Sequence, residues 1–218
     1  MAGQEEETVL SVATIDHLVY ATPNLDTTVR HLRDDWGIEL VPGGPHPGRG
    51  TCNWLAGLGD ATYLEVIGPD NDQPRPSSPR PFGVDDLTEA RLTAWCVRPN
   101  RALADVVADA LAMGVDLGTV LGMSRRRPDG VLLEWELTAA NPATLDPIVP
   151  FCIDWLESEH PTTSLSHNSL LGAFDLSHPD ADRIQRALDA IGIGRPVSVG
   201  ERRFSATLST PNGELILT

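Results

Sequence analysis

A short segment occurs three times in the chain, and each copy consists of an apolar strand that runs into a helical stretch. The first copy ends in Pro23-Asn24, the second in Pro99-Asn100 and the third in Pro179-Asp180. Each helical stretch is followed by further short runs of strand-forming residues. A unit repeated in this way constrains the chain to one architecture that is used several times. We therefore predict an α+β protein built from three β-α-β-β-β modules.

The connections between the modules set their boundaries. The first two modules, 12–68 and 91–156, form a predicted domain over residues 12–161, and the third module covers 168–218. The linker 69–90 between the first two is rich in proline and serine, which is typical of irregular chain. Within the first module we expect a strand at 38–41, and then a loop over 42–50 because proline and glycine crowd it.

Composition narrows the range of partners. The formal net charge is −15, which argues against a nucleic-acid partner because phosphates attract basic surfaces. Residues 1–8 are acidic and polar and do not form a signal peptide, and no apolar stretch approaches the ~20 residues that cross a bilayer. We expect a cytoplasmic protein that does not bind membranes. The three cysteines are scattered, as in a reduced protein.

Two short motifs carry a resemblance to a known superfamily. Asp16-His17-Leu18-Val19 lies early in the first module, and Tyr63-Leu64-Glu65-Val66 lies in its last strand. The order of these motifs resembles the vicinal oxygen chelate superfamily, which includes glyoxalases, bleomycin-resistance proteins and dioxygenases. Within it, the chain looks most like the bacterial glyoxalase-like group. The resemblance implies paired modules with curved, mostly antiparallel sheets, which form an open barrel around a divalent metal.

The same resemblance implies the metal ligands. His17 matches the first-strand histidine and Glu65 the last-strand glutamate, and Asp154 falls at the corresponding place in the second module. Thr93 stands where the second histidine is expected, so that His160 or His167 would have to supply another ligand. The residues agree with this reading, since an imidazole and a carboxylate on apolar strand faces suit Zn²⁺, Ni²⁺, Mn²⁺ or Fe²⁺. No motif for an organic cofactor is present.

Further candidate residues are assigned from their surroundings. Glu65 and Glu136 are the candidate catalytic carboxylates, although Glu136 also fits the wet face of a half-buried sheet. Arg125-Arg126-Arg127 could clamp a carboxylate or phosphate, but a charge run beside a turn is more often solvated, and we interpret it so. The loop 42–50, which carries His46 and Arg49, is a candidate lid. The predicted substrate-binding residues are Trp54, Arg49, His160 and His167.

Three functions remain open on the sequence. The first is a metal-dependent lyase or isomerase that stabilises an enolate of a small oxygenated molecule. The second is a protein of the same fold that binds or sequesters a small molecule or drug without turnover. The third is a ring-cleaving dioxygenase, which needs iron and a second histidine. The third module either packs within the chain or supplies the face of a homodimer.

Overall fold

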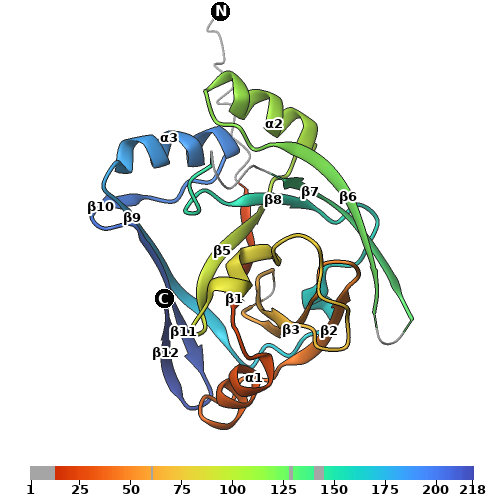
Figure 1. The fold of residues 1–218 in the computed structure, drawn as a ribbon. Coiled ribbons are helices and arrows are strands. Elements are labelled where there is room, and N and C mark those ends of the chain that lie inside the picture. Colours follow the sequence, from red (N-terminus) through yellow and green to blue (C-terminus); the bar gives the residue numbers. More distant parts are fainter. Residues whose placement is uncertain (1–12, 60, 128–129, 140–144) are drawn as a thin grey trace, which may run out of the picture.

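The described residues form two β-sheets, one of eight strands and one of four. In the computed structural model these residues are 13–218, except for 60, 128–129 and 140–144. The predicted start of the first module at Val12 and the polar residues 1–8 therefore lie outside the described residues. None of the described helices is long and apolar enough to cross a membrane. Figure 1 shows the helices α2 and α3 side by side at one end and α1 at the other.

The first module forms half of the large sheet. Its first strand pairs in parallel with its last strand, and its other strands follow antiparallel, in the order β2-β3-β4-β1. Asn24 caps the helix by accepting a hydrogen bond from the Thr27 backbone N–H. The elements are β1 (Thr14–Ala21), α1 (Leu25–Asp34), β2 (Val41–His46), β3 (Thr51–Gly57) and β4 (Tyr63–Pro69).

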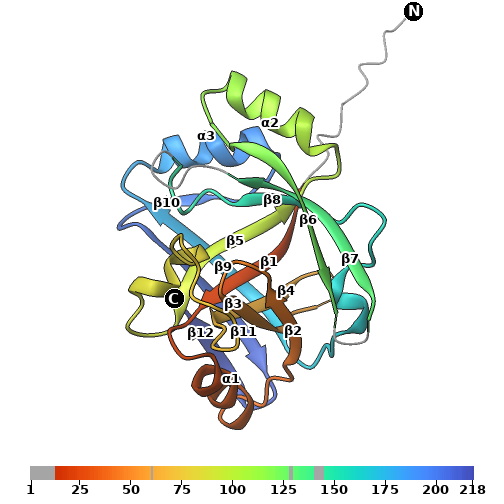
Figure 2. The ribbon, with the colours of Figure 1, turned by 45° about the vertical axis from the view of Figure 1, so that its right-hand side comes forward.

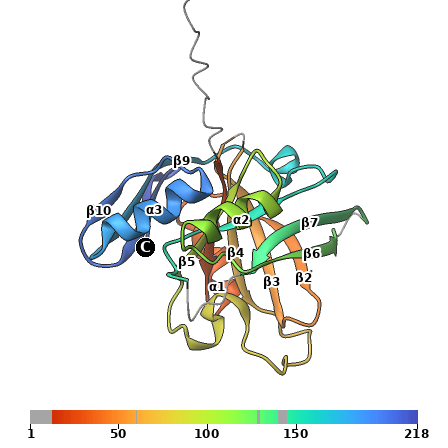
Figure 3. The same cartoon turned by 90° about the horizontal axis from the view of Figure 1, so that it is seen from above.

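The second module repeats this strand order and completes the sheet. Its strands lie in the order β5-β8-β7-β6, and β1 joins β5 antiparallel in the middle of the molecule (Figure 2). The outermost strands β2 and β6 also contact each other, so the sheet nearly closes into a barrel (Figure 3). The predicted α+β open-barrel class is confirmed. The elements are β5 (Arg91–Arg98), α2 (Leu103–Ala112), β6 (Thr119–Arg126), β7 (Leu132–Ala139) and β8 (Phe151–Asp154).

Two short 3₁₀ helices connect these elements to their neighbours. One, η1 (Pro81–Asp86), lies in the linker between the first two modules, and the other, η2 (Pro161–Ser164), follows β8. Each begins at a proline, whose fixed φ angle suits the first position of a helical turn. The described part of the linker is therefore irregular apart from one helical turn, as its composition indicates.

The third module has the predicted elements but joins its strands differently. Its order is β10-β9-β11-β12, so the first strand has the short β10 on one side and β11 on the other. In the other two modules the first strand instead lies beside the last strand of the module. A sequence pattern fixes the type of each element, whereas the strand order depends on tertiary contacts. The elements are β9 (Leu170–His178), α3 (Ala181–Ile191), β10 (Val197–Val199), β11 (Arg203–Thr210) and β12 (Gly213–Leu217).

The prediction of a loop over residues 42–50 is wrong, because strand β2 includes residues 42–46. The segment 42–50 was expected to be a loop after a strand at 38–41, but Val41–His46 pairs with β3. Two prolines are tolerated because β2 stands first in the strand order, where an N–H can be missing without breaking a ladder. The register shifts between Pro42 and Gly44, which marks a bulge. As a result, His46 lies at the end of a barrel strand.

The barrel sheet is buried on both faces. On the outer face Leu18, Leu64 and Trp95 share a core cluster with buried residues of all three helices. On the inner face Tyr63, Cys96 and Trp155 belong to a second cluster. Because side chains alternate along a strand, this division shows which predicted site residues enter the barrel.

Candidate functional site

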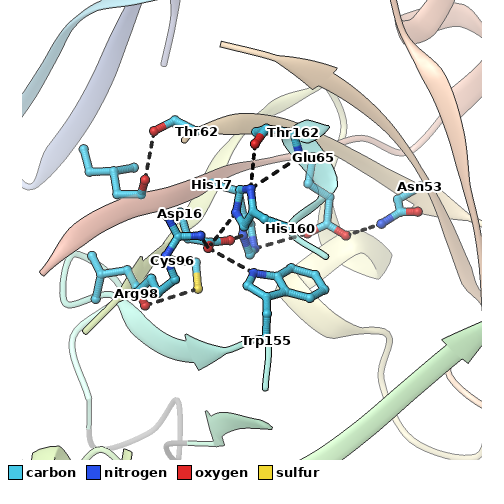
Figure 4. Close-up of polar contacts among 12 residues, drawn as sticks. Asp16, His17, Asn53, Thr62, Glu65, Cys96, Arg98, Trp155, His160 and Thr162 are labelled. Atoms are coloured by element: carbon cyan, nitrogen blue, oxygen red, sulfur yellow. Dashed lines mark hydrogen bonds and ion pairs between the residues drawn. The ribbon is translucent and has the colours of Figure 1, made fainter. Parts of the chain in front are cut away.

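A bulge in β1 brings two neighbouring polar residues to the same side of the sheet. Ile15 pairs with Val97 of β5 and His17 pairs with Cys96, so Asp16 has no partner in that strand. Side chains of consecutive strand residues normally point to opposite faces, and a bulge can re-aim one of them. Here His17 Nδ1 donates a hydrogen bond to Asp16 Oδ1 at 2.7 Å, and both side chains are buried (Figure 4).

Asp16 is an acceptor for four side chains. Its Oδ2 atom accepts from His160 Nε2 at 3.0 Å and Trp155 Nε1 at 3.1 Å, and Arg98 Nη1 lies 3.4 Å away. Burial alone would raise the pKa of Asp16, but the hydrogen bonds from His160 and His17 outweigh it and hold the pKa well below its usual range. The carboxylate is therefore ionised and fully engaged, which suits a residue that positions others.

His17 presents its second ring nitrogen to Glu65. Because Nδ1 is bonded to Asp16, Nε2 is the atom left to act, and it lies 3.7 Å from Glu65 Oε2. Glu65 is 8% exposed and comes from β4, which pairs in parallel with β1. The His17 ring stacks on Tyr63 with centroids 4.7 Å apart, and Phe151 lies edge-on to it. One wall of the site is therefore aromatic.

A second histidine faces the other oxygen of Glu65. His46 Nε2 lies 3.9 Å from Oε1, while its Nδ1 atom is hydrogen-bonded to Thr51 Oγ1 at 2.9 Å. Asn53 Nδ2 donates to the same Oε1 atom at 2.6 Å. Burial lowers the pKa of His46 more strongly than nearby Glu65 raises it, so that its imidazole is neutral at neutral pH.

A mainly apolar cavity lies on the Arg125 side of Asn53, and His17, His46 and Glu65 do not line it. It has a volume of about 240 Å³, and its walls come from β2, β3, β6, β7 and the segment after β8. Buried Arg125 of β6 lines it and donates from Nη1 to Asn53 Oδ1 at 2.9 Å. Asn53 thus connects the cavity to Glu65. The lining includes Val41, Pro42, Leu55, Leu133 and Leu165.

Two sets of side chains can be tested as a metal site. In the described part of the chain, Asp16, His17 and Cys96 are the set whose ligand atoms lie within 4.8 Å of one another. This set does not fit a metal, because Asp16 is already saturated with donors and burial raises the pKa of the Cys96 thiol well above its ordinary value. A metal binds the thiolate, not the thiol.

The more loosely spaced set of His17, His46 and Glu65 fits better. Both Nε2 atoms face the carboxylate, and both Nδ1 atoms are held by a neighbour, as is usual for histidines that bind metals. Two imidazoles and one carboxylate form a donor set that leaves other positions open for substrate oxygens. The first module supplies all three.

The second module does not bring its predicted residues to this cluster. Ile153 and Trp155 of the β8 segment fill the inner face, so Asp154 between them points outward, where its Oδ1 accepts from the Leu156 N–H. Glu136 of β7 pairs in register with Asp154 of β8 and therefore lies on the same outer face. Across from His17, β5 offers Cys96 instead of Thr93, whose buried hydroxyl has no hydrogen-bond partner among the described residues.

The predicted substrate-binding residues do not gather at one place, although His160 and His167 both contact Thr162. Trp54 is on the outer face of β3, where the guanidinium of Arg33 from α1 stacks 4.4 Å above its ring. Arg49 is exposed in the turn after β2. His160 bonds Asp16 through one ring nitrogen and Thr162 through the other. His167 is exposed and contacts the Thr162 carbonyl.

Four residues in or next to the cluster were not assigned to the site from the sequence. They are Asp16, His46, Asn53 and Arg125. Alternation places Asp16 opposite to His17, and only the bulge reverses this. The signal for Asn53 was present, since Asn53 and Leu55 share one face of β3 and Leu55 pairs with Glu65. His46 and Arg125 were hidden in segments interpreted as a loop and as a solvated charge run.

Several solved structures are similar to this chain. A Staphylococcus aureus protein described as hypothetical is similar over 94% of this chain and 84% of its own, with a TM-score of 0.61 and 17% identity. Methylmalonyl-CoA epimerase from Streptomyces coelicolor matches with a TM-score of 0.48, at 21% identity over 69% of this chain and 100% of its own. The epimerase from Mycobacterium tuberculosis gives a TM-score of 0.44 at 16% identity, over 68% of this chain and 91% of its own.

At 17% identity the likeness to the Staphylococcus aureus protein extends to the fold alone, and the two epimerases, whose TM-scores are below 0.5, support no conclusion about this chain. Among curated proteins no match to the chain was found. The family model for a glyoxalase-like domain matches residues 15–192, which include both modules of the barrel sheet. The chain therefore belongs to the glyoxalase-like domain family.

Proposed function

We propose that the protein is an enzyme that acts on a small oxygenated molecule at the cluster of His17, His46 and Glu65. Its chemistry is proton transfer at a carbon beside a carbonyl, as in a lyase or isomerase. One observation carries the proposal: two histidines direct Nε2 at the two oxygens of one buried carboxylate, at 3.7 and 3.9 Å. Buried ionisable groups are costly, and their convergence next to a cavity is characteristic of a functional site.

The same three side chains are the proposed ligands of a divalent ion, which when bound supplies Lewis-acid polarisation of the substrate carbonyl. The surrounding residues keep these side chains in place. Asp16 fixes the tautomer and orientation of His17, and Thr51 orients His46. Such outer hydrogen bonds leave both Nε2 atoms directed into the site.

Glu65 is the proposed proton acceptor. Its Oε1 atom is held by Asn53 at 2.6 Å, which orients the carboxylate, and its Oε2 atom faces His17. The rings of Tyr63 and Phe151 pack against His17 and limit the access of water from that side.

A ring-cleaving dioxygenase is the second candidate, and His46 favours it. The second module supplies no second histidine, but β2 brings His46 to Glu65. Two histidines and one carboxylate with open positions are also the ligands of non-haem Fe(II) oxygenases. The identity of the bound metal therefore separates the two candidates.

Metal analysis of untagged protein by elemental mass spectrometry tests the proposal. We expect about one divalent ion per chain, lost in His17→Ala and in His46→Ala. His31→Ala is the matched control, because His31 lies on α1 with a side chain that is 56% exposed. Zinc, nickel or manganese supports the lyase or isomerase, and iron supports the dioxygenase.

Proton exchange tests the chemistry itself. Loss of the C3 proton signals of 2-oxobutyrate or 2-oxoisovalerate in D₂O, followed by NMR, is expected with the wild type and not with Glu65→Gln. Protein that contains no metal, takes up none of the four ions under anaerobic conditions and exchanges no proton would contradict the proposal. The non-catalytic binding protein would then be the better explanation.

A further inference from the structure

The guanidinium group of Arg125 is buried in the barrel without a carboxylate partner among the described residues. The residue is 8% exposed, and its Nη1 atom donates a hydrogen bond to the neutral Asn53 amide. Its Nε atom is buried and has no hydrogen-bond partner in the described part of the chain. Buried charges are normally paired, so this arrangement is incomplete.

The unused donor lies on a particular edge of the guanidinium group. Asn53 occupies Nη1, whereas Nε lies on the side of the group that can bind a carboxylate with two parallel N–H···O bonds. Asn53 in turn donates to Glu65 Oε1, so it stands between the arginine and the glutamate. Glu65 is therefore not the direct partner of Arg125.

The surroundings leave space for this arrangement. A Cβ atom at Gly43 of β2 would lie 2.2 Å from Asn53 Oδ1 and 3.2 Å from Arg125 Nη1. A side chain here would therefore displace both groups. The Arg125 side chain also lines the 240 Å³ cavity, whose other walls include Leu55, Leu133 and Leu165. Arg127 lines the cavity as well, and of the two arginines Arg125 is the buried one.

We propose that Arg125 binds the carboxylate of the substrate, and that the substrate class is a small monocarboxylate with an apolar body. This inference rests on the proposed function, because it assigns to Arg125 the carboxylate of the substrate that the His17, His46 and Glu65 cluster would act on. The cavity is smaller than the roughly 300–1,000 Å³ of sites for drug-sized ligands, so it suits a molecule of few atoms. A protein with a net charge of −15 repels anions in general, and a buried arginine overcomes this locally.

Binding of an acid and its neutral amide to metal-free protein is the test. Isovalerate and isovaleramide have nearly the same shape, and only the acid carries the charge. We expect isothermal titration to show that isovalerate binds at least about tenfold more tightly than isovaleramide. Arg125→Gln should lower isovalerate affinity by about the same factor and leave the amide unchanged.

Arg126→Gln is the matched control. Arg126 is the next residue on β6, but it is exposed and donates to the Gly130 carbonyl. Isovalerate affinity is expected to stay within about twofold in this variant, since surface charges contribute little. Equal affinities of acid and amide in the wild type would overturn the proposal, and this comparison does not depend on whether Arg125→Gln folds.

The outcome is separate from that of the proposed function. Glu65→Gln is expected to bind isovalerate and to lose proton exchange, because the anion contacts Arg125 and not Glu65. Selective binding of the acid without any metal or exchange would leave a carboxylate-binding protein. Exchange with equal affinity for acid and amide would support the enzyme and refute the role of Arg125.

Discussion

His17 and Glu65 lie on adjacent parallel strands, with Nε2 of the histidine 3.7 Å from Oε2 of the glutamate. In the register of the two strands, Glu65 pairs with Val19 and His17 pairs with Tyr63, so the two site residues are diagonal neighbours. Each of the two residues is hydrogen-bonded to a neighbour, His17 to Asp16 and Glu65 to Asn53. The contact therefore depends on two further side chains, Asp16 and Asn53, which do not line the cavity.

Replacement of Asp16 tests how far the site depends on this support. Asp16→Asn removes the ionised acceptor of His17, His160 and Trp155, and frees the tautomer of His17. We expect metal affinity to fall about 10–100-fold. We also expect the free energy of unfolding to fall by about 3–5 kcal/mol, as for the removal of one partner from a buried ion pair.

Asp109→Asn is the control for this variant, because Asp109 forms an exposed pair with Arg101. It should change neither quantity appreciably, since exposed ion pairs contribute about 0–1 kcal/mol. Metal titration and urea denaturation measure the two effects. Equal behaviour of the two variants would show that Asp16 does not position His17.

The lowered pKa of His46 predicts a dependence of stability on pH. In the unfolded chain the imidazole titrates near its ordinary pKa of about 6.5, and in the folded protein it titrates at lower pH because burial disfavours the charge. Between these two values the unfolded state binds more protons, so the free energy of unfolding falls as the pH is lowered from about 6.5.

Urea denaturation between pH 5 and pH 7.5 measures this dependence. His46→Asn should remove part of the slope, and His31→Asn should not, because His31 is exposed on α1. The comparison is made on metal-free protein, since a bound ion would itself compete with protons for the imidazole. A His46→Asn curve with the same slope as the wild type would mean that His46 does not titrate as its burial implies.

The resemblance to the vicinal oxygen chelate superfamily implied the open barrel, whereas periodicity and turn residues were sufficient to predict most strands of the modules. They were not sufficient for strand β2. Its sequence, Val41-Pro-Gly-Gly-Pro-His46, has poor strand propensity and forms a strand only through pairing with β3. The strand order of the third module depends on long-range contacts in the same way.

The candidate site was predictable where strand alternation holds. His17 and Glu65 lie together because both obey it, and Asp154 lies outside because alternation places it between Ile153 and Trp155. Asp16 was not predicted because a β-bulge interrupts the alternation of side chains at this residue. Arg125 was not predicted because nothing in a run of three arginines indicates which of them is buried. Its burial depends on contacts that form when the barrel sheet closes.

The packing around Gly43 leaves no room for a side chain. An added methyl group would overlap the Asn53 amide, with 2.2 Å between Cβ and Oδ1. Gly43→Ala is therefore expected to cost about 1–3 kcal/mol of stability and to weaken isovalerate binding as Asn53 and Arg125 shift. Gly122→Ala on β6 is the control, since nothing lies within 4 Å of its added Cβ. Thermal denaturation and titration calorimetry compare the two, and unchanged binding in Gly43→Ala would contradict the described packing.

The carboxylates on the outer face of β7 and β8 are not expected to take part in the site. Asp154 and Glu136 pair in register there, and Oδ1 of Asp154 is already used by the Leu156 N–H. Asp154→Asn and Glu136→Gln should therefore leave metal content and proton exchange as in the wild type, with stability changes within about 0.5 kcal/mol. Glu65→Gln, which changes a carboxylate in the same conservative way, should abolish exchange. Loss of metal in Asp154→Asn would instead place a ligand in the second module, and would require β8 to turn its side chains toward the barrel.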